Sequence, residues 1–314
     1  MAIKVTPITS PAQWHELRKR NVGASEVAAL FGIHDYVTGF ALAARKLGKL
    51  PDVIDNKILQ RGRLLEPVAR QLLAEERQDL VQIAAGSYYS DEEIRFGATP
   101  DLFVRDELGR VGICQIKTVA PSVFARKWHG EAGTIVPPLW IALQAMSEMH
   151  LTGSDFAIIA AVVVDDWGLS LEVVEVPYLP KVIAEAREKV FLFWQMVNLG
   201  HLPAPDYGQD YRTITKVFAE DDGGEIDLTA DNELPEIVDQ LQALKHARST
   251  AEDGIEEAQA KILHRLGSAQ RARYAGGVIT AKTEHRKAYQ VAESTRRPLR
   301  IKQVSQGRTG ERAA

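Results

Sequence analysis

The sequence contains a single cysteine, Cys114, among 314 residues. One cysteine excludes an intramolecular disulfide and any zinc site built from several thiolates. The chain also has no run near the roughly 18 consecutive apolar residues that a membrane-spanning helix requires. No apolar segment of the kind found in secretory leaders follows the first residues. We therefore expect a protein of a reducing cytoplasm, without a membrane anchor.

Neither sign of charge dominates the chain. The 38 Lys and Arg residues face 42 Asp and Glu residues, a net charge of −4, and the pI is near 6.1. This balance argues against a protein that coats nucleic acid through bulk positive charge. It leaves open an enzyme whose acidic metal site lies in a local basic groove, because the distribution is uneven. Residues 220–239 are acidic, whereas residues 282–312 carry nine Lys and Arg against three Asp and Glu.

Several short motifs of other enzyme classes are missing. The sequence has no Walker A motif, no GxGxxG and no HxxxH or HxH pair. Nucleotide hydrolysis, dinucleotide binding and a histidine-rich metal site therefore have no support. Hydrophobic residues make up 45% of the chain and charged residues 25%, which is typical of a globular protein.

The spacing of apolar residues predicts an α/β core. Helical periodicity covers residues 38–47, 58–79, 138–151 and 179–199. Between and after these helices, shorter β-like segments occur at residues 86–90, 96–98, 102–105, 111–118, 156–164 and 169–176. This order predicts a sheet of four or five strands covered by helices.

The composition changes after Pro205, and we divide the chain accordingly. We assign residues 1–212 to the α/β domain. Residues 213–275 are expected to form a helical, coiled-coil-like hairpin, because apolar residues recur at helical spacing from Leu234 to Leu266 with a break near Gly254. Residues 276–314 are expected to form a basic β-hairpin tail with a frayed end.

Four residues carry the chemistry of a metal-dependent hydrolytic site. Gln115 and Lys117 are two apart on one expected strand, so they share one face of it. Asp101 begins the preceding strand and can point to the same place, and Glu66 adds a second carboxylate from a helix. Carboxylate and amide oxygens suit Mg²⁺ or Mn²⁺. A lysine beside them can position a water or stabilise charge that develops on a phosphate.

These residues sit in a longer pattern that resembles a known family. The spacing from Asp101 to Lys117 resembles the PD-(D/E)XK nuclease motif, and the wider chain is similar to lambda-type exonucleases and YqaJ-like viral recombinases. Five segments follow in the family order: WHELRKRNVGASEV, RGRLLEPVARQLL, ATPDLF, CQIKT and LWIALQAMSEMHLTG. The resemblance covers residues 12–205. It implies a restriction-endonuclease-like core, a central mixed sheet flanked by helices, to which this chain adds its helical and β-hairpin appendage.

The resemblance implies a role for each matching residue of the metal centre. Glu66 and Asp101 would bind Mg²⁺ or Mn²⁺, helped by the backbone carbonyl of Ile116, and Lys117 would act on the attacking water. The family usually has Glu where this chain has Gln115. An amide can still offer an oxygen to a cation, but the missing charge weakens binding by about 1–4 kcal/mol.

Three further residues have implied roles and simpler alternatives. By resemblance, Arg18 and Ser25 would hold the terminal 5′-phosphate of DNA, and Gln144 would support the catalytic centre. An arginine beside a hydroxyl is a sound phosphate site. Ser25 could equally be a helix N-cap only, Arg18 a surface charge and Gln144 an amide on a helix surface.

The activity implied by the family is 5′-to-3′ degradation of one strand of linear duplex DNA, which leaves a 3′ single-stranded tail. Family members often form ring-shaped homo-oligomers and act in phage or prophage recombination beside a single-strand annealing protein. Two alternatives remain open. Gln115 could mark a DNA-end-binding protein with weakened or lost catalysis, and the same core also supports endonucleases.

Overall fold

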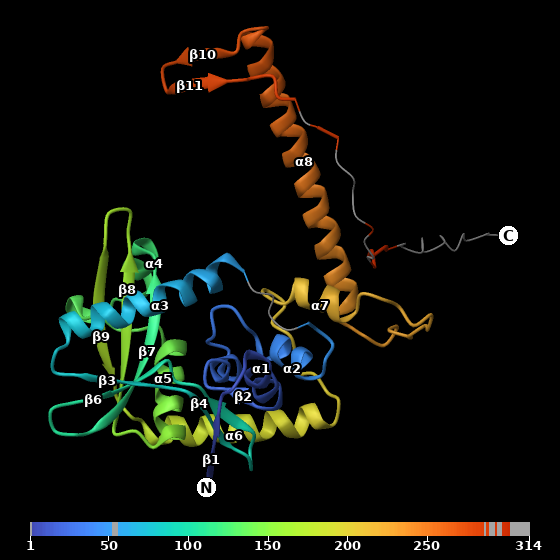
Figure 1. Ribbon diagram of the computed structural model, residues 1–314. Coiled ribbons are helices and arrows are strands. Elements are labelled where there is room, and N and C mark those ends of the chain that lie inside the picture. The colour runs from blue at the N-terminus through green and yellow to red at the C-terminus, as the bar shows by residue number, and fades with distance from the viewer. Residues whose placement is uncertain (1, 52–55, 286, 289–292, 294–296, 302–314) are drawn as a thin grey trace. The chain divides into compact units, whose positions relative to one another are not determined.

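The computed structural model describes residues 2–51, 56–285, 287–288, 293 and 297–301. The chain separates into two compact units, Met1–Phe218 and Ala219–Ala314, and most of their helices and strands are labelled in Figure 1. The boundary that we expected after residue 212 falls within helix α7 (Tyr211–Val217), and the three-part division of the chain stays a prediction. The described helices include none long and apolar enough to cross a membrane.

A five-stranded sheet forms the centre of the first unit. Its strand order is β3-β6-β7-β8-β9. The strands are β3 (Val81–Ala84), β6 (Leu102–Arg105), β7 (Val111–Val119), β8 (Phe156–Val164) and β9 (Leu169–Val176). Strands β7 and β8 pair in parallel, whereas the other pairs are antiparallel. The predicted α/β core with a central mixed sheet is confirmed.

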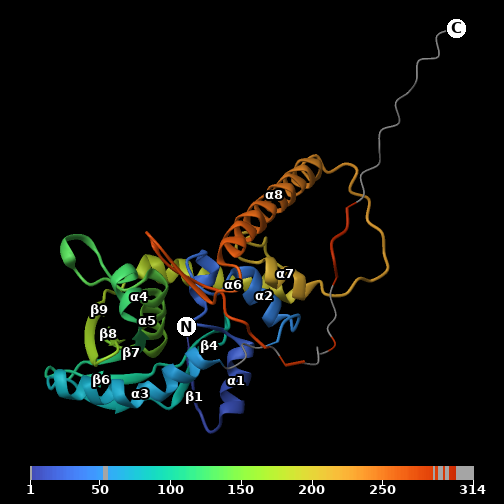
Figure 2. The ribbon, with the colours of Figure 1, turned by 90° about the horizontal axis from the view of Figure 1, so that it is seen from above.

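Helices cover both faces of this sheet, as Figures 1 and 2 show. The described helices of the unit are α1 (Pro11–Arg20), α2 (Gly39–Lys46), α3 (Lys57–Glu76), α4 (Pro121–Lys127), α5 (Leu139–Thr152), α6 (Pro180–Asn198) and α7, with 3-10 turns η1 (Val27–Phe31) and η2 (Glu131–Gly133). Alternate side chains of β7 point to opposite faces of the sheet. Cys114 and Ile116 pack with Leu73 of α3, and Ile113 packs with Ile141 of α5. Strand β8 reads FAIIAAVVV because it is buried on both faces.

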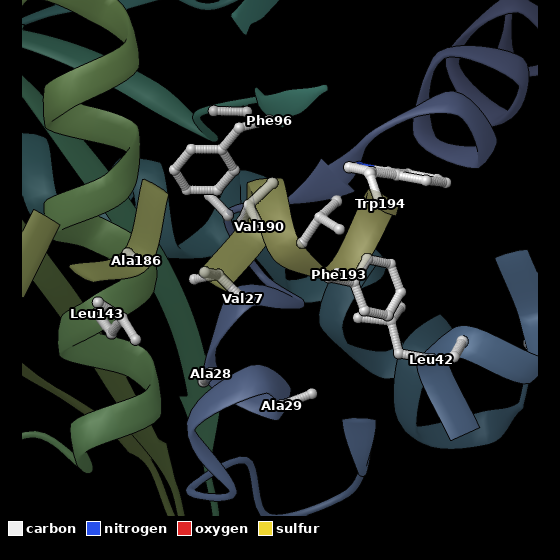
Figure 3. Close-up of a cluster of buried hydrophobic side chains, with 14 of the residues drawn as sticks. Val27, Ala28, Ala29, Leu42, Phe96, Leu143, Ala186, Val190, Phe193 and Trp194 are labelled. Atoms are coloured by element: carbon white, nitrogen blue, oxygen red, sulfur yellow. The ribbon is translucent and has the colours of Figure 1, made fainter. Parts of the chain in front are cut away.

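A second sheet lies beside the N-terminal helices, and it contains the β-like segments 86–90 and 96–98, which we expected in a single sheet with the others. It has the order β1-β4-β5-β2, with β1 (Ile3–Pro7), β2 (Val22–Gly23), β4 (Ser87–Asp91) and β5 (Phe96–Ala98). Its core gathers residues from β2, η1, α2, β5 and α6, among them Val27, Phe96 and Trp194 (Figure 3). Strands β1, β2 and β3 and helix α4 were missed, because two-to-seven-residue segments carry too little periodicity to identify.

The second unit corrects two expectations. Residues 234–266 form one continuous helix, α8 (Leu234–Leu266), and not a helical hairpin. Gly254 lowers helix stability by about 1 kcal/mol relative to Ala, which does not break a helix of 33 residues. The β-hairpin starts earlier than expected, since β10 (Arg271–Tyr274) pairs with β11 (Gly277–Thr280). Much of the predicted basic tail lies outside the described residues.

Candidate active site

The pairing of β6 with β7 brings Asp101 and Gln115 together. Leu102 is opposite Cys114 in the antiparallel register, so Asp101, one residue before Leu102, lies opposite Gln115, one residue after Cys114. The Gln115 amide Nε2 and the Ile116 backbone N–H both donate to Asp101 Oδ2, the latter at 2.9 Å. Removal of water from this carboxylate raises the pKa of Asp101 to about 6. The predicted juxtaposition of these two side chains is therefore present.

Lys117 is held from the opposite side by helix α5. Its Nζ donates to Gln144 Oε1 at 2.9 Å, and Gln144 Nε2 donates to Glu148 Oε1 at 2.9 Å. Gln144 is buried, so it is not an amide on a helix surface. Burial lowers the pKa of Lys117, and burial together with the charge of Asp101 raises the pKa of Glu148 to about 8. A polar chain thus runs from the sheet into the core.

Glu148 was not singled out from the sequence. It is 2% exposed, and its Oε2 is buried without a hydrogen-bond partner in the described chain. A signal was present, because Glu148 lies four residues after Gln144 and so on the same side of a helix that is otherwise rich in apolar residues. A carboxylic acid at such a place is costly unless it is paired or neutral.

Glu66 is connected to Asp101 by hydrogen bonds that Arg70 donates to both residues. Arg70 donates to Glu66 Oε1 at 2.5 Å, one turn away on α3, and to the backbone carbonyl of Asp101 at 2.7 Å. Glu66 is about one-third exposed. The structure therefore places Glu66 near the start of β6, with its charge directed at Arg70.

The donor set fits a cation that prefers oxygen ligands. Gln115 is 3% exposed, and its Oε1 is buried with no hydrogen-bond partner among the described residues. An orphaned carbonyl oxygen beside the Asp101 carboxylate is what an Mg²⁺ or Mn²⁺ ligand pair requires. No group of three or more His, Cys, Asp and Glu in the described ranges could hold a metal ion alone. A site here would therefore need the amide oxygen of Gln115.

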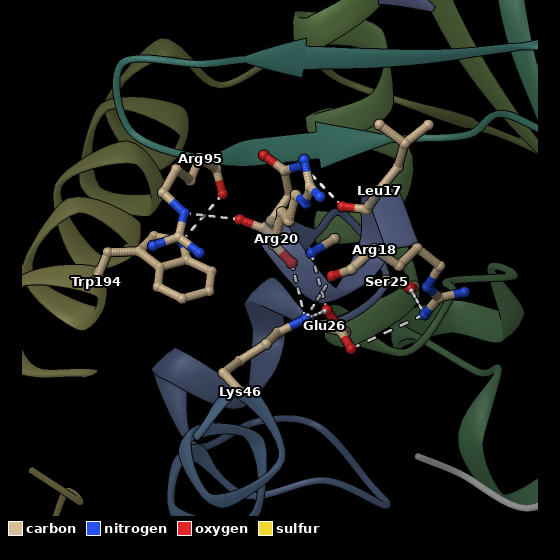
Figure 4. A network of polar contacts seen from close by, with 10 residues as sticks. Leu17, Arg18, Arg20, Ser25, Glu26, Lys46, Arg95 and Trp194 are labelled. Atoms are coloured by element: carbon tan, nitrogen blue, oxygen red, sulfur yellow. Dashed lines mark hydrogen bonds and ion pairs between the residues drawn. The ribbon is translucent and has the colours of Figure 1, made fainter. Parts of the chain in front are cut away.

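A second polar cluster surrounds Arg18 and Ser25 (Figure 4). Arg18 Nη2 donates to Ser25 Oγ at 3.4 Å and lies 3.9 Å from Glu26 Oε1. Ser25 does not cap a helix, because η1 begins at Val27 with Glu26 at the cap position. Its hydroxyl is thus available to an anion alongside the arginine. Arg18 is one-third exposed, which leaves it accessible from solvent.

Glu26 and Lys46 form an ion pair that contacts this cluster. Lys46 Nζ donates to the Arg18 and Asn21 carbonyls at 2.8 and 2.7 Å and to Glu26 Oε2 at 3.0 Å. Burial opposes ionisation of Glu26, but Lys46, Arg18 and the Gly23 N–H outweigh it and hold the pKa of Glu26 below its usual range. Burial also lowers the pKa of Lys46. The pair fixes the backbone that carries Arg18.

Comparison with known proteins identifies the domain that contains both clusters. Residues 13–155 match the family model of the YqaJ-like viral recombinase domain. This part of the chain is similar to YqaJ-like viral recombinase domains. Every site residue named above lies within the matched range, while β8, β9 and α6 lie beyond it. The family resemblance found in the sequence is therefore confirmed.

Two solved structures are similar to part of the chain. An alkaline exonuclease from Laribacter hongkongensis, LHK-Exo, is 23% identical with a TM-score of 0.47, over 60% of this chain and 93% of that one. The complex of LHK-Exo with dAMP gives the same values. No curated protein matches this chain.

Proposed function

We propose that this protein is a metal-dependent exonuclease that degrades one strand of linear duplex DNA from a 5′ end. The observation that carries the proposal is the meeting of Asp101, Gln115 and Lys117 at the start of β6 and the middle of β7. The YqaJ-like viral recombinase domain supports it, because the family resemblance implies this activity. Its product would be a 3′ single-stranded tail for phage-type recombination in a bacterial cytoplasm.

Each side chain has a physical role in such hydrolysis. Asp101, the Gln115 Oε1, the Ile116 carbonyl and Glu66 would hold Mg²⁺ or Mn²⁺. When bound, the cation neutralises the phosphate and lowers the pKa of a water. Lys117 Nζ would position that water or stabilise the charge that develops on the phosphate oxygens.

The chain from Gln144 to Glu148 restricts Lys117 to one place. Gln144 accepts from Lys117 and donates to Glu148, each at 2.9 Å. Because both partners are buried, the ammonium is oriented by groups whose own rotamers are fixed. Gln144 and Glu148 would therefore be positioning residues.

The first experiment compares linear and closed circular duplex DNA with titrated Mg²⁺ and Mn²⁺. An exonuclease that requires an end consumes the linear form and leaves the circle intact. Cleavage of the circle would instead indicate an endonuclease on the same core. Binding of ends without cleavage at any cation concentration would favour the non-catalytic DNA-end-binding protein that Gln115 raises as an alternative.

Arg18→Ala tests the proposed phosphate site. The wild-type enzyme should digest 5′-phosphorylated linear DNA faster than 5′-hydroxyl DNA, because Arg18 and the Ser25 hydroxyl would both bind the terminal phosphate. The variant should reduce that rate ratio by about tenfold, the equivalent of one charge-assisted hydrogen bond. Arg126→Ala on α4 is the control. An unchanged ratio in Arg18→Ala would remove the phosphate assignment and leave the cation site untouched.

Gln115→Glu tests the cation site by calorimetry and thermal unfolding. The added carboxylate beside Asp101 should raise Mg²⁺ affinity by about one to three orders of magnitude. In EDTA the same substitution should lower the free energy of unfolding by about 1–3 kcal/mol, because it replaces a donor to Asp101 with a like charge. Gln195→Glu on α6 is exposed and should change neither quantity. Equal behaviour of both variants would rule out a cation at this position.

The substrate and partners follow from the same proposal. The substrate would be the ends of linear duplex DNA. The family resemblance further predicts a single-strand annealing protein as a partner and a ring-shaped homo-oligomer.

A further inference from the structure

Helix α8 presents an uncovered row of large apolar side chains. Leu266 is its one buried residue. Ile237, Leu244, Ile255 and Ile262 are 54%, 61%, 55% and 42% exposed. A helix of 33 residues gains most of its stability from packing an apolar face. Such a row on one helix therefore points to a second helix that covers it.

The row follows the seven-residue period of a coiled coil. Taking Leu234 as position a, positions a recur at residues 241, 248, 255 and 262, and positions d fall at residues 237, 244, 251, 258 and 265. Eight of these ten residues are Leu, Ile or Ala, and the two exceptions are Arg248 and Arg265. A heptad pattern sustained over four repeats is typical of a coiled-coil helix. A single helix packed on its own unit has no need of this period.

We propose that α8 pairs with α8 of a second copy of this chain in an antiparallel two-stranded coiled coil. The central Arg248 decides the direction. In a parallel dimer, positions a face each other, so Arg248 would meet Arg248 of the second copy at the centre of the seam. Two like charges at that distance repel. In an antiparallel dimer, positions a face positions d, and this contact does not occur.

The full-overlap antiparallel register gives complementary layers. It places Arg248 against Ala251 of the second copy, and the small alanine leaves room for the arginine stem while its guanidinium reaches water. The same register places Leu244 against Ile255 and Ile237 against Ile262. Large apolar side chains thereby fill the layers on either side of the arginine. Because the interface is two-fold symmetric, each of these contacts occurs twice.

Charges beside the seam favour the same register. Lys245 and Glu252 both occupy position e, and positions e of the two helices flank one another in an antiparallel pair. The register that matches the layers brings Lys245 beside Glu252 of the second copy. In a parallel pair, Lys245 would instead face Gln240 and Glu252 would face Ala247, so neither charge would gain a partner. The direction set by Arg248 and the direction set by these charges agree.

The first test measures the mass of the full chain by sedimentation equilibrium without DNA. The wild type should have a mass that is an even multiple of 34.7 kDa, because α8 would join the copies in pairs even where the first units also form a ring. Leu244→Glu with Ile255→Glu, both on the seam, should raise the dimer dissociation constant by more than about 100-fold. Ala243→Glu with Ala260→Glu adds the same charge to exposed positions off the seam and should leave it within about threefold. A monomeric wild type, or equal effects of the two pairs, would overturn the proposal.

The second test measures direction and register. A spin label at Glu236→Cys should lie about 40 Å from its copy along an antiparallel dimer, against less than about 20 Å in a parallel one. Cys114 is buried and should stay unlabelled. Lys245→Glu and Glu252→Lys should each weaken the dimer about fivefold, and the double reversal should restore it. A short distance, or no restoration, would overturn the antiparallel register. None of these measurements depends on nuclease activity.

Discussion

Lys117→Ala should reduce DNA cleavage by about 10²–10⁴-fold. In the structure, Nζ of Lys117 is aimed by the buried Gln144 and lies on the same strand as Gln115, two residues away. No other lysine is placed in this way within the described part of the site. Water fills the space in the variant but cannot supply a fixed positive charge. The measurement is the initial rate on linear 5′-phosphorylated duplex DNA at saturating Mg²⁺.

Two controls separate loss of chemistry from loss of structure. Lys189→Ala removes a lysine from α6 that forms a half-exposed ion pair with Glu185 and lies over the Phe31 ring, and its rate should stay within about twofold of wild type. Lys117→Ala should still bind 5′-phosphorylated ends in Ca²⁺, measured by fluorescence anisotropy. Cleavage within threefold of wild type would show that Lys117 is not part of the reaction.

Lys46→Met should lower the free energy of unfolding by about 3–5 kcal/mol at pH 7. Lys46 is 6% exposed and donates to Glu26 and to two backbone carbonyls. Methionine has a similar length but donates nothing, so Glu26 keeps a buried charge with Arg18 as its nearest remaining cation, 3.9 Å away. Denaturant unfolding at pH 7 measures the change. The control Lys189→Met should cost less than about 1 kcal/mol.

The pH dependence of this loss has a definite sign. In the wild type the pKa of Glu26 is lowered, so its contribution to stability is present above about pH 4.3 and is lost as pH falls through the folded-state pKa. In Lys46→Met, burial should dominate and raise that pKa. Protonation then relieves the penalty, and the difference between variant and wild type should shrink as pH falls. The double variant with Glu26→Gln should recover part of the stability at pH 7. A deficit that is constant with pH would show that Glu26 is not its cause.

The Gln115 position links the proposed activity to its main alternative. Its amide both donates to Asp101 and leaves an orphaned oxygen beside it. The first contact keeps the site folded without a cation, since no like charge opposes Asp101. Under the proposed function, the second would provide a cation ligand of lower charge than the glutamate that the resemblance leads us to expect. We therefore expect this protein to require a higher Mg²⁺ concentration than a relative with glutamate at this position. The cation would bind at the same site in both proteins.

The local periodicity of the sequence was enough to determine most long elements. Strands β8 and β9 were predicted at their observed bounds, because an apolar run and an alternating segment flank a turn of Asp and Gly. The juxtaposition of Asp101 with Gln115 also followed from strand pairing alone. In contrast, the continuity of α8 could not be derived, since Gly254 weakens a helix without deciding whether it breaks.

The sequence by itself determined the α/β class, the family and the residue types of the candidate site. Only the tertiary structure decided the partners of those residues. It separated one expected sheet into two, connected Glu66 to the site through Arg70, and placed Glu148 behind Gln144. It also showed Ser25 facing Arg18 instead of capping a helix. The physical reason is that periodicity reports contacts within a few residues, whereas these partners are fixed by packing between elements distant in the chain.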